Sequence, residues 1–210
     1  MNNSKLHGIY LVIDPSMKSV QLIKKVKQAL RGGVDILQIW NHWPKGITRN
    51  EKEKLITSIH KLAADFSVPV FINDDWKLLK STPLQGIHFD TVPDDFEQIK
   101  QEIERPFMAG ITCSNDLETV RWAAQNDLDY ISFCAMYPSP SVDSCEIVRP
   151  KTVHRARKIT DLPLFLSGGM TPNKIKELNE MEFNGVAVIS GILNANDVQT
   201  AAEYYTKALA

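Results

Sequence analysis

Apolar residues along this chain fall into two patterns that alternate from one end to the other. Short runs rich in β-branched and aromatic residues predict buried strands, and longer stretches with apolar residues at spacings of three and four predict amphipathic helices. The predicted strands are Ile9–Ile13, Asp35–Ile39, Val68–Ile72, Gly86–Phe89, Phe107–Thr112, Tyr130–Cys134, Leu162–Leu166 and Val186–Ile189. The predicted helices are Val20–Leu30, Glu51–Phe66, Phe96–Ile103, Asp116–Asn126, Pro150–Ile159, Pro172–Met181 and Val198–Ala208, with a short, weak one at Trp76–Leu79.

This alternation amounts to about eight β/α units and determines the expected fold class. Strands that alternate with helices form a parallel sheet with right-handed crossovers. Eight such units close into a compact α/β structure, the (β/α)8 TIM barrel. A doubly wound open sheet is the alternative, which is disfavoured because no GxGxxG follows the first strand. Since no linker or low-complexity segment interrupts the alternation, we expect residues 1–210 to form a single barrel domain.

Composition and charge narrow the class of protein. The chain carries 24 Lys and Arg residues against 25 Asp and Glu residues, for a formal net charge of -1, so a general attraction to nucleic acid or to an anionic membrane is not expected. The first residues lack the apolar core of a signal peptide, and the longest apolar runs are only as long as strands. The three cysteines have no metal-type spacing, which favours reduced thiols. We expect a cytoplasmic protein.

Polar residues gather where the predicted strands end, whereas the strand interiors carry almost none. In a barrel of this kind the chemistry takes place at the C-terminal ends of the strands. In chain order these ends read Asp14-Pro15-Ser16, Gln38-Ile39-Trp40-Asn41-His42, Asn73-Asp74-Asp75, His88-Phe89-Asp90, Thr112-Cys113-Ser114-Asn115, Tyr137-Pro138-Ser139-Pro140-Ser141, Ser167-Gly168-Gly169 and Ser190-Gly191. The sequence therefore predicts a functional site at this face of the barrel.

The last two predicted strands end in small residues, within the segments LFLSGGMTP (164–172) and GVAVISGIL (185–193). Loops after strands seven and eight commonly bind a phosphate group through backbone N–H groups and the start of a short helix. We therefore predict a phosphate site formed by Gly168, Gly169, Ile189 and Ser190. The alternative interpretation is that the glycines only form a tight turn before a helix that Thr171 caps.

Six segments in register carry a resemblance to a known family. They are GVDILQ (33–38), FIND (71–74), GIHF (86–89), DYI (129–131) with YPSPS (137–141), GGMTP (168–172) and GVAVIS (185–190). Together they span nearly the whole chain, which resembles the thiamine-phosphate synthase family, including the TenI-like thiazole tautomerases. The synthases are transferases that join an aminopyrimidine diphosphate to a thiazole phosphate and release pyrophosphate, with Mg2+ as cofactor.

The resemblance implies roles for individual residues. It assigns the glycine-rich ends of strands seven and eight to the thiazole phosphate. Asp74 would hold Mg2+, and Gln38 and Asn73 would contact the pyrimidine diphosphate or its ring. Ser139 and Ser141 would stand where the family has hydroxyls that contact the thiazole and its phosphate. The implied partners are small phosphorylated thiazole and pyrimidine substrates.

The chain departs from the family pattern at its cations. The synthases have Q-x-R-x-K at the end of strand two, where this chain has Trp40 and His42 in place of the Arg and the Lys. A protonated His42 could replace one of them, and so could Lys45 or Arg49. The Lys that follows the family's hydroxyls after strand six is Val142 here. The diphosphate and phosphate groups would each lose a charge-assisted partner.

Two further family positions are changed. The second metal-ligating Asp, after strand four, is Pro93 here, so Asp90 or Asp94 would have to substitute for it. The tautomerase His after strand five is Ser114. His88 is expected to serve structure or ring packing rather than proton transfer, which leaves His42 as the other candidate for catalysis.

Three hypotheses remain open at this point. The first is a diverged thiamine-phosphate synthase, and the second is a TenI-like isomerase or salvage enzyme that acts on a thiazole phosphate alone. The third is a non-catalytic protein that binds thiamine precursors. Apolar helix faces could also support a homodimer.

Overall fold

Eight parallel strands close into a barrel in the order β1-β2-β3-β4-β5-β6-β7-β8, with β1 paired to β8. The computed structural model describes residues 6–138, 146–178 and 180–210. The strands are β1 (Gly8–Ile13), β2 (Ile36–Ile39), β3 (Val70–Asn73), β4 (Gly86–Phe89), β5 (Met108–Thr112), β6 (Tyr130–Phe133), β7 (Leu164–Ser167) and β8 (Gly185–Val188). The predicted (β/α)8 TIM barrel is thereby confirmed.

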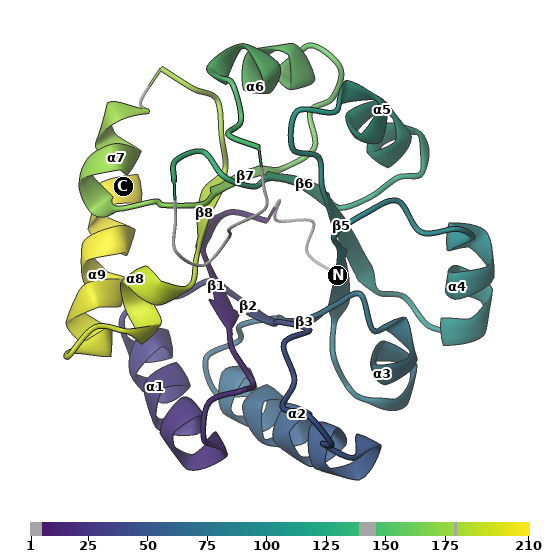
Figure 1. Ribbon diagram of the computed structural model, residues 1–210, viewed down its shortest axis with the longest axis vertical. Helices are drawn as coiled ribbons and strands as arrows, with labels where there is room; N and C mark the ends of the chain where they lie inside the picture. Colours follow the sequence, from purple (N-terminus) through teal and green to yellow (C-terminus); the bar gives the residue numbers. More distant parts are fainter. Residues whose placement is uncertain (1–5, 139–145, 179) are drawn as a thin grey trace.

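The helices surround this barrel as an outer ring (Figure 1). They are α1 (Ser19–Arg31), α2 (Arg49–Ala64), α3 (Trp76–Ser81), α4 (Phe96–Ile103), α5 (Leu117–Gln125), α6 (Pro150–Arg157), α7 (Pro172–Glu177), α8 (Ser190–Leu193) and α9 (Val198–Leu209). The weak third helix is formed, because the Asp75 carboxylate accepts a hydrogen bond from the backbone N–H of Leu78 and so caps it.

Two strands begin two residues later than the apolar pattern predicts. The runs that start at Val68 and Leu162 each contain a proline, and the strands begin only after it, at Val70 and Leu164. Proline has no N–H to donate to the ladder and is tolerated at the start of a strand rather than inside one. Val68 instead completes the turn after α2, where its N–H donates to the carbonyl of Ala63.

The core consists of two layers of apolar contacts. The larger layer packs the outer faces of the strands against the helices. The smaller one lies inside the barrel and contains Tyr10, Ile36, Phe71, Tyr130 and Phe165. The Tyr130 ring is in edge contact with Phe165, with ring centroids 5.5 Å apart. Aromatic rings therefore fill part of the barrel interior.

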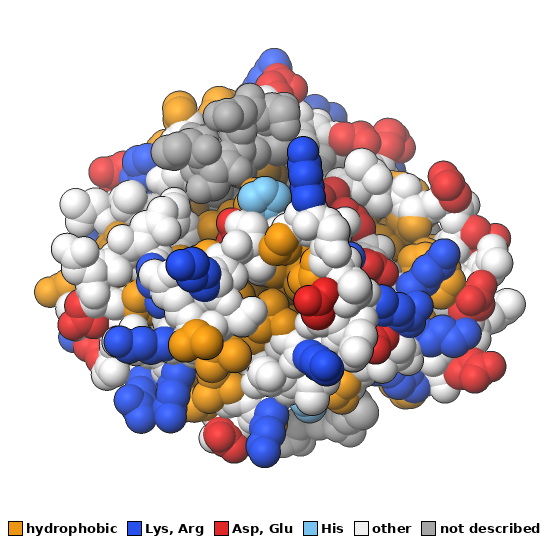
Figure 2. Space-filling view, turned by 60° about the horizontal axis from the view of Figure 1, so that its bottom comes forward, with side chains coloured by type: hydrophobic (Ala, Val, Ile, Leu, Met, Phe, Trp, Pro, Cys, Tyr) orange, Lys and Arg blue, Asp and Glu red, His pale blue; other side chains and the backbone are white. Residues whose placement is uncertain are grey.

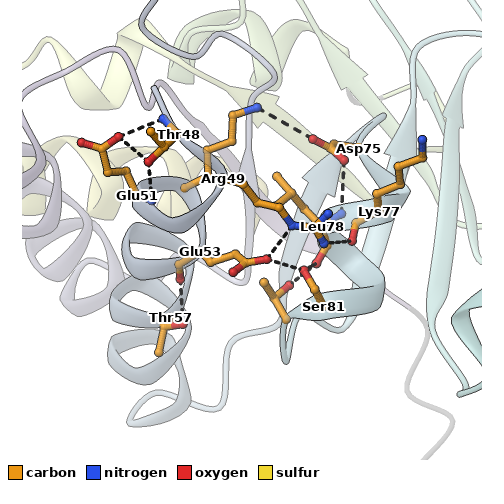
Figure 3. Close-up of polar contacts among 11 residues, drawn as sticks. Thr48, Arg49, Glu51, Glu53, Thr57, Asp75, Lys77, Leu78 and Ser81 are labelled. Atoms are coloured by element: carbon orange, nitrogen blue, oxygen red, sulfur yellow. Dashed lines mark hydrogen bonds and ion pairs between the residues drawn. The ribbon is translucent and has the colours of Figure 1, made fainter. Parts of the chain in front are cut away.

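Helices α2 and α3 are joined by polar contacts (Figure 3). The carboxylate of Glu53 accepts from Arg49 Nε at 2.9 Å and from Ser81 Oγ at 2.8 Å. Thr48 and Glu51 form a capping box at the start of α2. These contacts join the two helices that follow β2 and β3. The C-terminal ends of these two strands carry polar residues of the predicted site.

Lys, Arg, Asp and Glu side chains are interspersed over the face that Figure 2 shows, in keeping with a net charge near zero. Among the helices in the described ranges, none is both long and apolar enough to cross a membrane.

Candidate active site

A pocket of about 490 Å³ opens at the C-terminal ends of the strands. Every strand or the loop after it contributes to the wall. The lining residues are Tyr10, Val12, Gln38, Trp40, Asn73, His88, Asp90, Thr112, Ser114, Ser132, Cys134, Ser167, Gly168, Gly169, Met170, Ala187, Val188, Ile189, Ser190 and Gly191. The pocket therefore brings together Gln38, Asn73 and the four residues of the predicted phosphate site.

One side of the pocket is formed by the loop after β7. Gly168 and Gly169 both have left-handed backbone conformations, with φ values of 84° and 63°. A Cβ on Gly168 would overlap the backbone of Ala135, and a Cβ on Gly169 would lie 2.6 Å from the carbonyl oxygen of Pro138. Only glycine fits these two positions without strain, so the backbone of this loop lies close to the backbone of the loop after β6.

The same loop is fastened on its outer side. Lys174 Nζ donates to the carbonyl of Gly169 at 2.9 Å and lies 4.2 Å from the centroid of the Tyr137 ring. Tyr205 Oη donates to the carbonyl of Met170 at 2.8 Å. Thr171 caps α7, as the alternative interpretation of the glycines supposed. Both interpretations are compatible, because the turn before α7 is also the pocket wall.

The loop after β8 forms the neighbouring part of the wall. Ile189 is the N-terminal flanking residue of α8, and Ser190 is the first residue of that helix. The start of a helix presents backbone N–H groups that can bind an anion. The ends of β7 and β8 together thus offer small residues and N–H groups to one ligand, which suits a phosphate group.

Asn73 lines the opposite side of the pocket but uses its amide within the protein. Its Oδ1 accepts from the backbone N–H of Asn41 at 3.3 Å, and its Nδ2 donates to the carbonyl of His88 at 3.3 Å. The side chain also hydrogen-bonds the carboxylate of Asp90. Asn73 therefore joins the ends of β2, β3 and β4 and helps to shape the pocket.

Side-chain hydrogen bonds run across the barrel interior, among residues of which Tyr10, Gln38, His88 and Thr112 also line the pocket. Tyr10 Oη donates to Gln38 Oε1 at 2.7 Å and lies 2.7 Å from Tyr130 Oη. Tyr130 Oη lies 2.9 Å from His88 Nδ1, and His88 Nε2 lies 2.9 Å from Thr112 Oγ1. Tyr10, inside β1, and Tyr130, the first residue of β6, are exceptions to the expectation that strand interiors carry almost no polar groups.

His88 is buried, with 6% of its surface exposed. Burial lowers the pKa of its imidazole to about 4, so the ring is neutral at physiological pH. The ring stacks on Tyr130 with centroids 5.7 Å apart. These contacts are in line with a role in structure and ring packing.

Two carboxyl groups come together where β3 and β4 end, and Asp90 lines the pocket whereas Asp74 does not. Asp74 has a φ of 55°, and its Oδ1 accepts from the backbone N–H of Asp90 at 2.9 Å. Partial burial, together with the charge of Asp74, raises the pKa of the Asp90 carboxyl to about 6. Of the two possible substitutes for the acid replaced by Pro93, Asp90 lines the pocket. This pair of oxygen donors is suited to Mg2+, which binds carboxylate oxygens.

The end of β2 presents an aromatic wall in place of the family's cations. Trp40 lines the pocket, and the exposed His42 lies beside it, with ring centroids 4.9 Å apart. His42 Nδ1 lies 3.1 Å from Asp14 Oδ1. Arg49 is held on α2 by Glu53. Lys45 is exposed. In the part of the chain described, His42, Lys45 and Arg49 are all absent from the pocket lining.

Ser139 and Ser141 lie outside the described residues, as does Val142. Ser114, which stands at the position of the tautomerase His, lines the pocket and has a φ of 46°.

Comparison with known proteins decides the family. A family model described as thiamine monophosphate synthase matches residues 9–192. The chain belongs to this family. Relatives of the thiamine monophosphate synthase family include a thiamine-phosphate synthase of Nitrosococcus oceani, 28% identical over 204 residues that cover 97% of this chain and 93% of the relative. Thiamine-phosphate synthase 1 of Aquifex aeolicus is 29% identical over 203 residues, covering 95% and 92%.

The fold is also that of a solved family structure. Thiamine phosphate pyrophosphorylase from Pyrococcus furiosus superposes with a TM-score of 0.82 at 20% identity, covering 96% of this chain and 95% of that one. The resemblance seen in the sequence is thus confirmed at the level of family and fold.

Proposed function

We propose that this member of the thiamine monophosphate synthase family is a transferase of thiamine biosynthesis that joins an aminopyrimidine diphosphate to a thiazole phosphate and releases pyrophosphate. The observation that carries the proposal is a single pocket of about 490 Å³ with two unlike sides. One side offers glycine backbone and helix-start N–H groups, and the other offers a buried amide and aromatic rings. A phosphate group suits the first side and a polar heteroaromatic ring suits the second.

In this proposal Gly168, Gly169, Ile189 and Ser190 bind the phosphate of the thiazole. Gln38 contacts the pyrimidine ring, and Asn73 shapes its side of the pocket through its bonds to Asn41, His88 and Asp90. Ser139 and Ser141 are proposed to contact the thiazole and its phosphate, as the family resemblance implies.

The chemistry follows from charge. The bond between the methylene carbon of the pyrimidine and the diphosphate oxygen breaks, and its electron pair leaves with pyrophosphate. The electron-rich aminopyrimidine supports the resulting cation until the lone pair of the thiazole nitrogen forms the new carbon–nitrogen bond. This reaction needs little proton transfer, so it suits a site whose His88 is neutral and held by hydrogen bonds on both nitrogens.

Mg2+ is part of the proposal. Asp74 and Asp90 would hold it, and it would supply positive charge to the leaving diphosphate. The described residues contain no group of three or more His, Cys, Asp or Glu side chains suited to a metal ion. Proteins nevertheless usually bind Mg2+ through only one or two carboxylates, because the ion keeps several water ligands and also binds substrate phosphates.

Pyrophosphate release by the purified protein tests the function. The protein is given both substrates, with and without Mg2+, beside a Trp40→Arg, His42→Lys double variant that restores the family's cations. We expect metal-dependent release by the unmodified protein and faster release by the variant. Release by the variant alone would contradict the synthase activity.

One observation favours a second candidate function. The aromatic wall of Trp40 and the pairing of His42 with Asp14 leave the diphosphate side without the family's fixed cations, whereas Gly168, Gly169, Ile189 and Ser190 all line the pocket on the monophosphate side. A TenI-like isomerase or salvage enzyme acting on a thiazole phosphate would need only the monophosphate side of the pocket. Turnover of the thiazole phosphate without pyrophosphate would identify it, and binding without any turnover would identify a precursor-binding protein.

We also propose a cytoplasmic location, in keeping with phosphorylated intermediates as substrates. The partners in this proposal are the small thiazole and pyrimidine phosphates.

A further inference from the structure

Five side chains from five strands form a continuous series of hydrogen bonds inside the barrel, which we call the interior series. Its members are Gln38 on β2, Tyr10 on β1, Tyr130 on β6, His88 on β4 and Thr112 on β5. Tyr10, Gln38, His88 and Tyr130 are buried, with exposures between 0% and 6%. The proposed reaction does not use these groups for proton transfer, so another reason for so many buried polar groups is needed.

Counting protons gives the series a direction. A tyrosine hydroxyl has one proton to donate. Tyr10 donates to Gln38 Oε1, so at its contact with Tyr130 its oxygen can only accept. Tyr130 has then used its own proton on Tyr10, and its oxygen must accept from His88 Nδ1.

The imidazole continues the series in the same direction. A neutral imidazole carries one N–H, and here that N–H is on Nδ1. Nε2 is then an acceptor, and the hydroxyl of Thr112 donates to it across 2.9 Å. The protons therefore point from Thr112 to His88, Tyr130, Tyr10 and finally Gln38.

The direction of the series matters at its Gln38 end, because Gln38 lines the pocket. Because the amide oxygen of Gln38 is engaged by Tyr10, its amide nitrogen is the group that can be directed to a ligand. A glutamine amide that turned over would present an oxygen instead and would select a ligand with the opposite hydrogen-bonding edge. A fixed direction thus converts an ambiguous side chain into a hydrogen-bond donor.

We propose that Thr112, His88, Tyr130 and Tyr10 are positioning residues that hold Gln38 as a hydrogen-bond donor to an acceptor nitrogen of a heteroaromatic ligand. That this ligand is the aminopyrimidine rests on the proposed function. The direction of the interior series does not, and it can be tested without substrate.

The first experiment reads the tautomer of His88 by ¹⁵N NMR of histidine-labelled protein. We expect Nδ1 to carry the proton and Nε2 to be bare. A His60→Gln variant helps the assignment, because the Gln85 amide lies 3.0 Å from His60 Nε2 and holds that ring as well. Finding the proton on Nε2 of His88 would show that the series runs the other way and would overturn the proposal.

Two variants test the coupling along the series. In Tyr10→Phe, Tyr130 loses its acceptor and is expected to donate to His88 Nδ1 instead, which moves the imidazole proton to Nε2. In Tyr130→Phe, Nδ1 loses its partner and the proton is expected on Nε2, with Thr112 as acceptor. Tyr205→Phe is the matched control, since it removes a buried hydroxyl that donates to Met170 outside the series. An unchanged tautomer in both test variants would contradict the coupling.

The second experiment tests the effect on the ligand by calorimetry. The probes are the aminopyrimidine diphosphate and a pyridine analogue in which CH replaces one ring nitrogen. We expect the unmodified protein to prefer the pyrimidine by roughly tenfold or more, as sites built to hydrogen-bond a ligand discriminate against analogues that lack the group. Tyr10→Phe is expected to lose most of this preference while keeping its affinity for the thiazole phosphate.

Failure of the positioning role and failure of the proposed reaction would give different results. Equal discrimination in the unmodified protein and in Tyr10→Phe would overturn the positioning role, even if pyrophosphate is released normally. Absence of pyrophosphate release, with the predicted tautomer and the predicted discrimination, would instead count against the proposed reaction alone.

Discussion

Asp74 and Asp90 bring two carboxyl groups together beside the pocket, where the backbone N–H of Asp90 donates to Asp74 Oδ1. Like charges at such a distance disfavour ionisation of one of them, and here burial and the charge of Asp74 raise the pKa of Asp90 to about 6. A pair of groups that lowers the stability of the folded protein in this way is typical of a binding site.

Asp90→Asn is therefore expected to stabilise the metal-free protein. Because the folded-state pKa of Asp90 lies above the unfolded value, the aspartate favours the folded state fully below about pH 4 and loses this contribution as pH rises toward 6. Above pH 6 we expect the variant to be more stable by on the order of 1 kcal/mol, after allowance for screening by solvent. The gain should disappear below about pH 4. Urea unfolding with a chelator present, at several pH values, measures it.

Asp94→Asn provides the control, since Asp94 is exposed and does not line the pocket in the described part of the chain. Equal pH profiles for the two variants would show that the effect does not come from the Asp74–Asp90 pair.

Ser190→Asp tests the phosphate loops. A carboxylate at the first residue of α8 would repel a bound phosphate, so affinity for the thiazole phosphate should fall by roughly tenfold or more. Calorimetry measures the loss, and Ser58→Asp on the exposed face of α2 adds the same charge elsewhere. Glycine positions are less suitable, because Gly169 has a left-handed φ and no room for a Cβ. Unchanged affinity in Ser190→Asp would contradict the location of the phosphate.

Residues at the C-terminal end of a strand or just after it could be placed from the sequence, because the ends of parallel strands lie on the same face of the barrel. Gln38, Asn73, Gly168 and Ser190 all line the pocket for this reason. Thr112 was also placed at this face as a strand end, but Tyr10, which belongs to the same site, was missed. An aromatic strand residue gives no sign in the sequence of whether its hydroxyl meets a partner from a distant strand.

At the scale of single elements, α2 shows how a local signal sets a boundary. The apolar pattern predicts a start at Glu51, but the helix begins at Arg49 because Thr48 caps it. Thr48 Oγ1 accepts from the N–H of Glu51, and the Glu51 carboxylate accepts from the N–H of Thr48. The T-x-x-E spacing that makes this possible is present in the sequence. Periodicity alone did not detect it, since neither residue is apolar.

Thr48→Ala is expected to lower the free energy of unfolding by about 1 kcal/mol, the usual cost of losing an N-cap. Thr57→Ala, in the middle of the same helix (Figure 3), is the matched control. Thr57 only donates to the carbonyl of Glu53, and alanine is the better helix former, so this variant should be as stable as the unmodified protein or more so. Urea unfolding compares them, and similar losses in both would contradict the capping role.

At the scale of the whole molecule, the pairing of β1 with β8 closes the sheet. The alternation of patterns was enough to predict this architecture, because eight parallel units leave little choice but closure. The packing at the seam could not be predicted. Thr206 on α9 donates to the carbonyl of Gly32 at the end of α1, a contact between residues far apart in the sequence.

We propose that residues 1–210 fold as one domain and expect a single cooperative unfolding transition. The four tryptophans all lie between residues 40 and 122, so their fluorescence reports the first part of the barrel, whereas far-ultraviolet circular dichroism reports all of it. The two signals should coincide in urea. Separate midpoints would mean that parts of the barrel unfold independently. Repeating the titration at two protein concentrations tests the predicted homodimer, which would make the midpoint depend on concentration.

The seam between β1 and β8 also has a consequence for synthesis on the ribosome. The first strand to emerge is paired on one side by the last, in the register Gly8 to Gly185. Until β8 has left the exit tunnel, a nascent chain exposes β1 and β7 as unprotected sheet edges, which are sites of aggregation. Tyr10 and Ser190 line the same pocket, so the binding site is also among the last parts of the barrel to form.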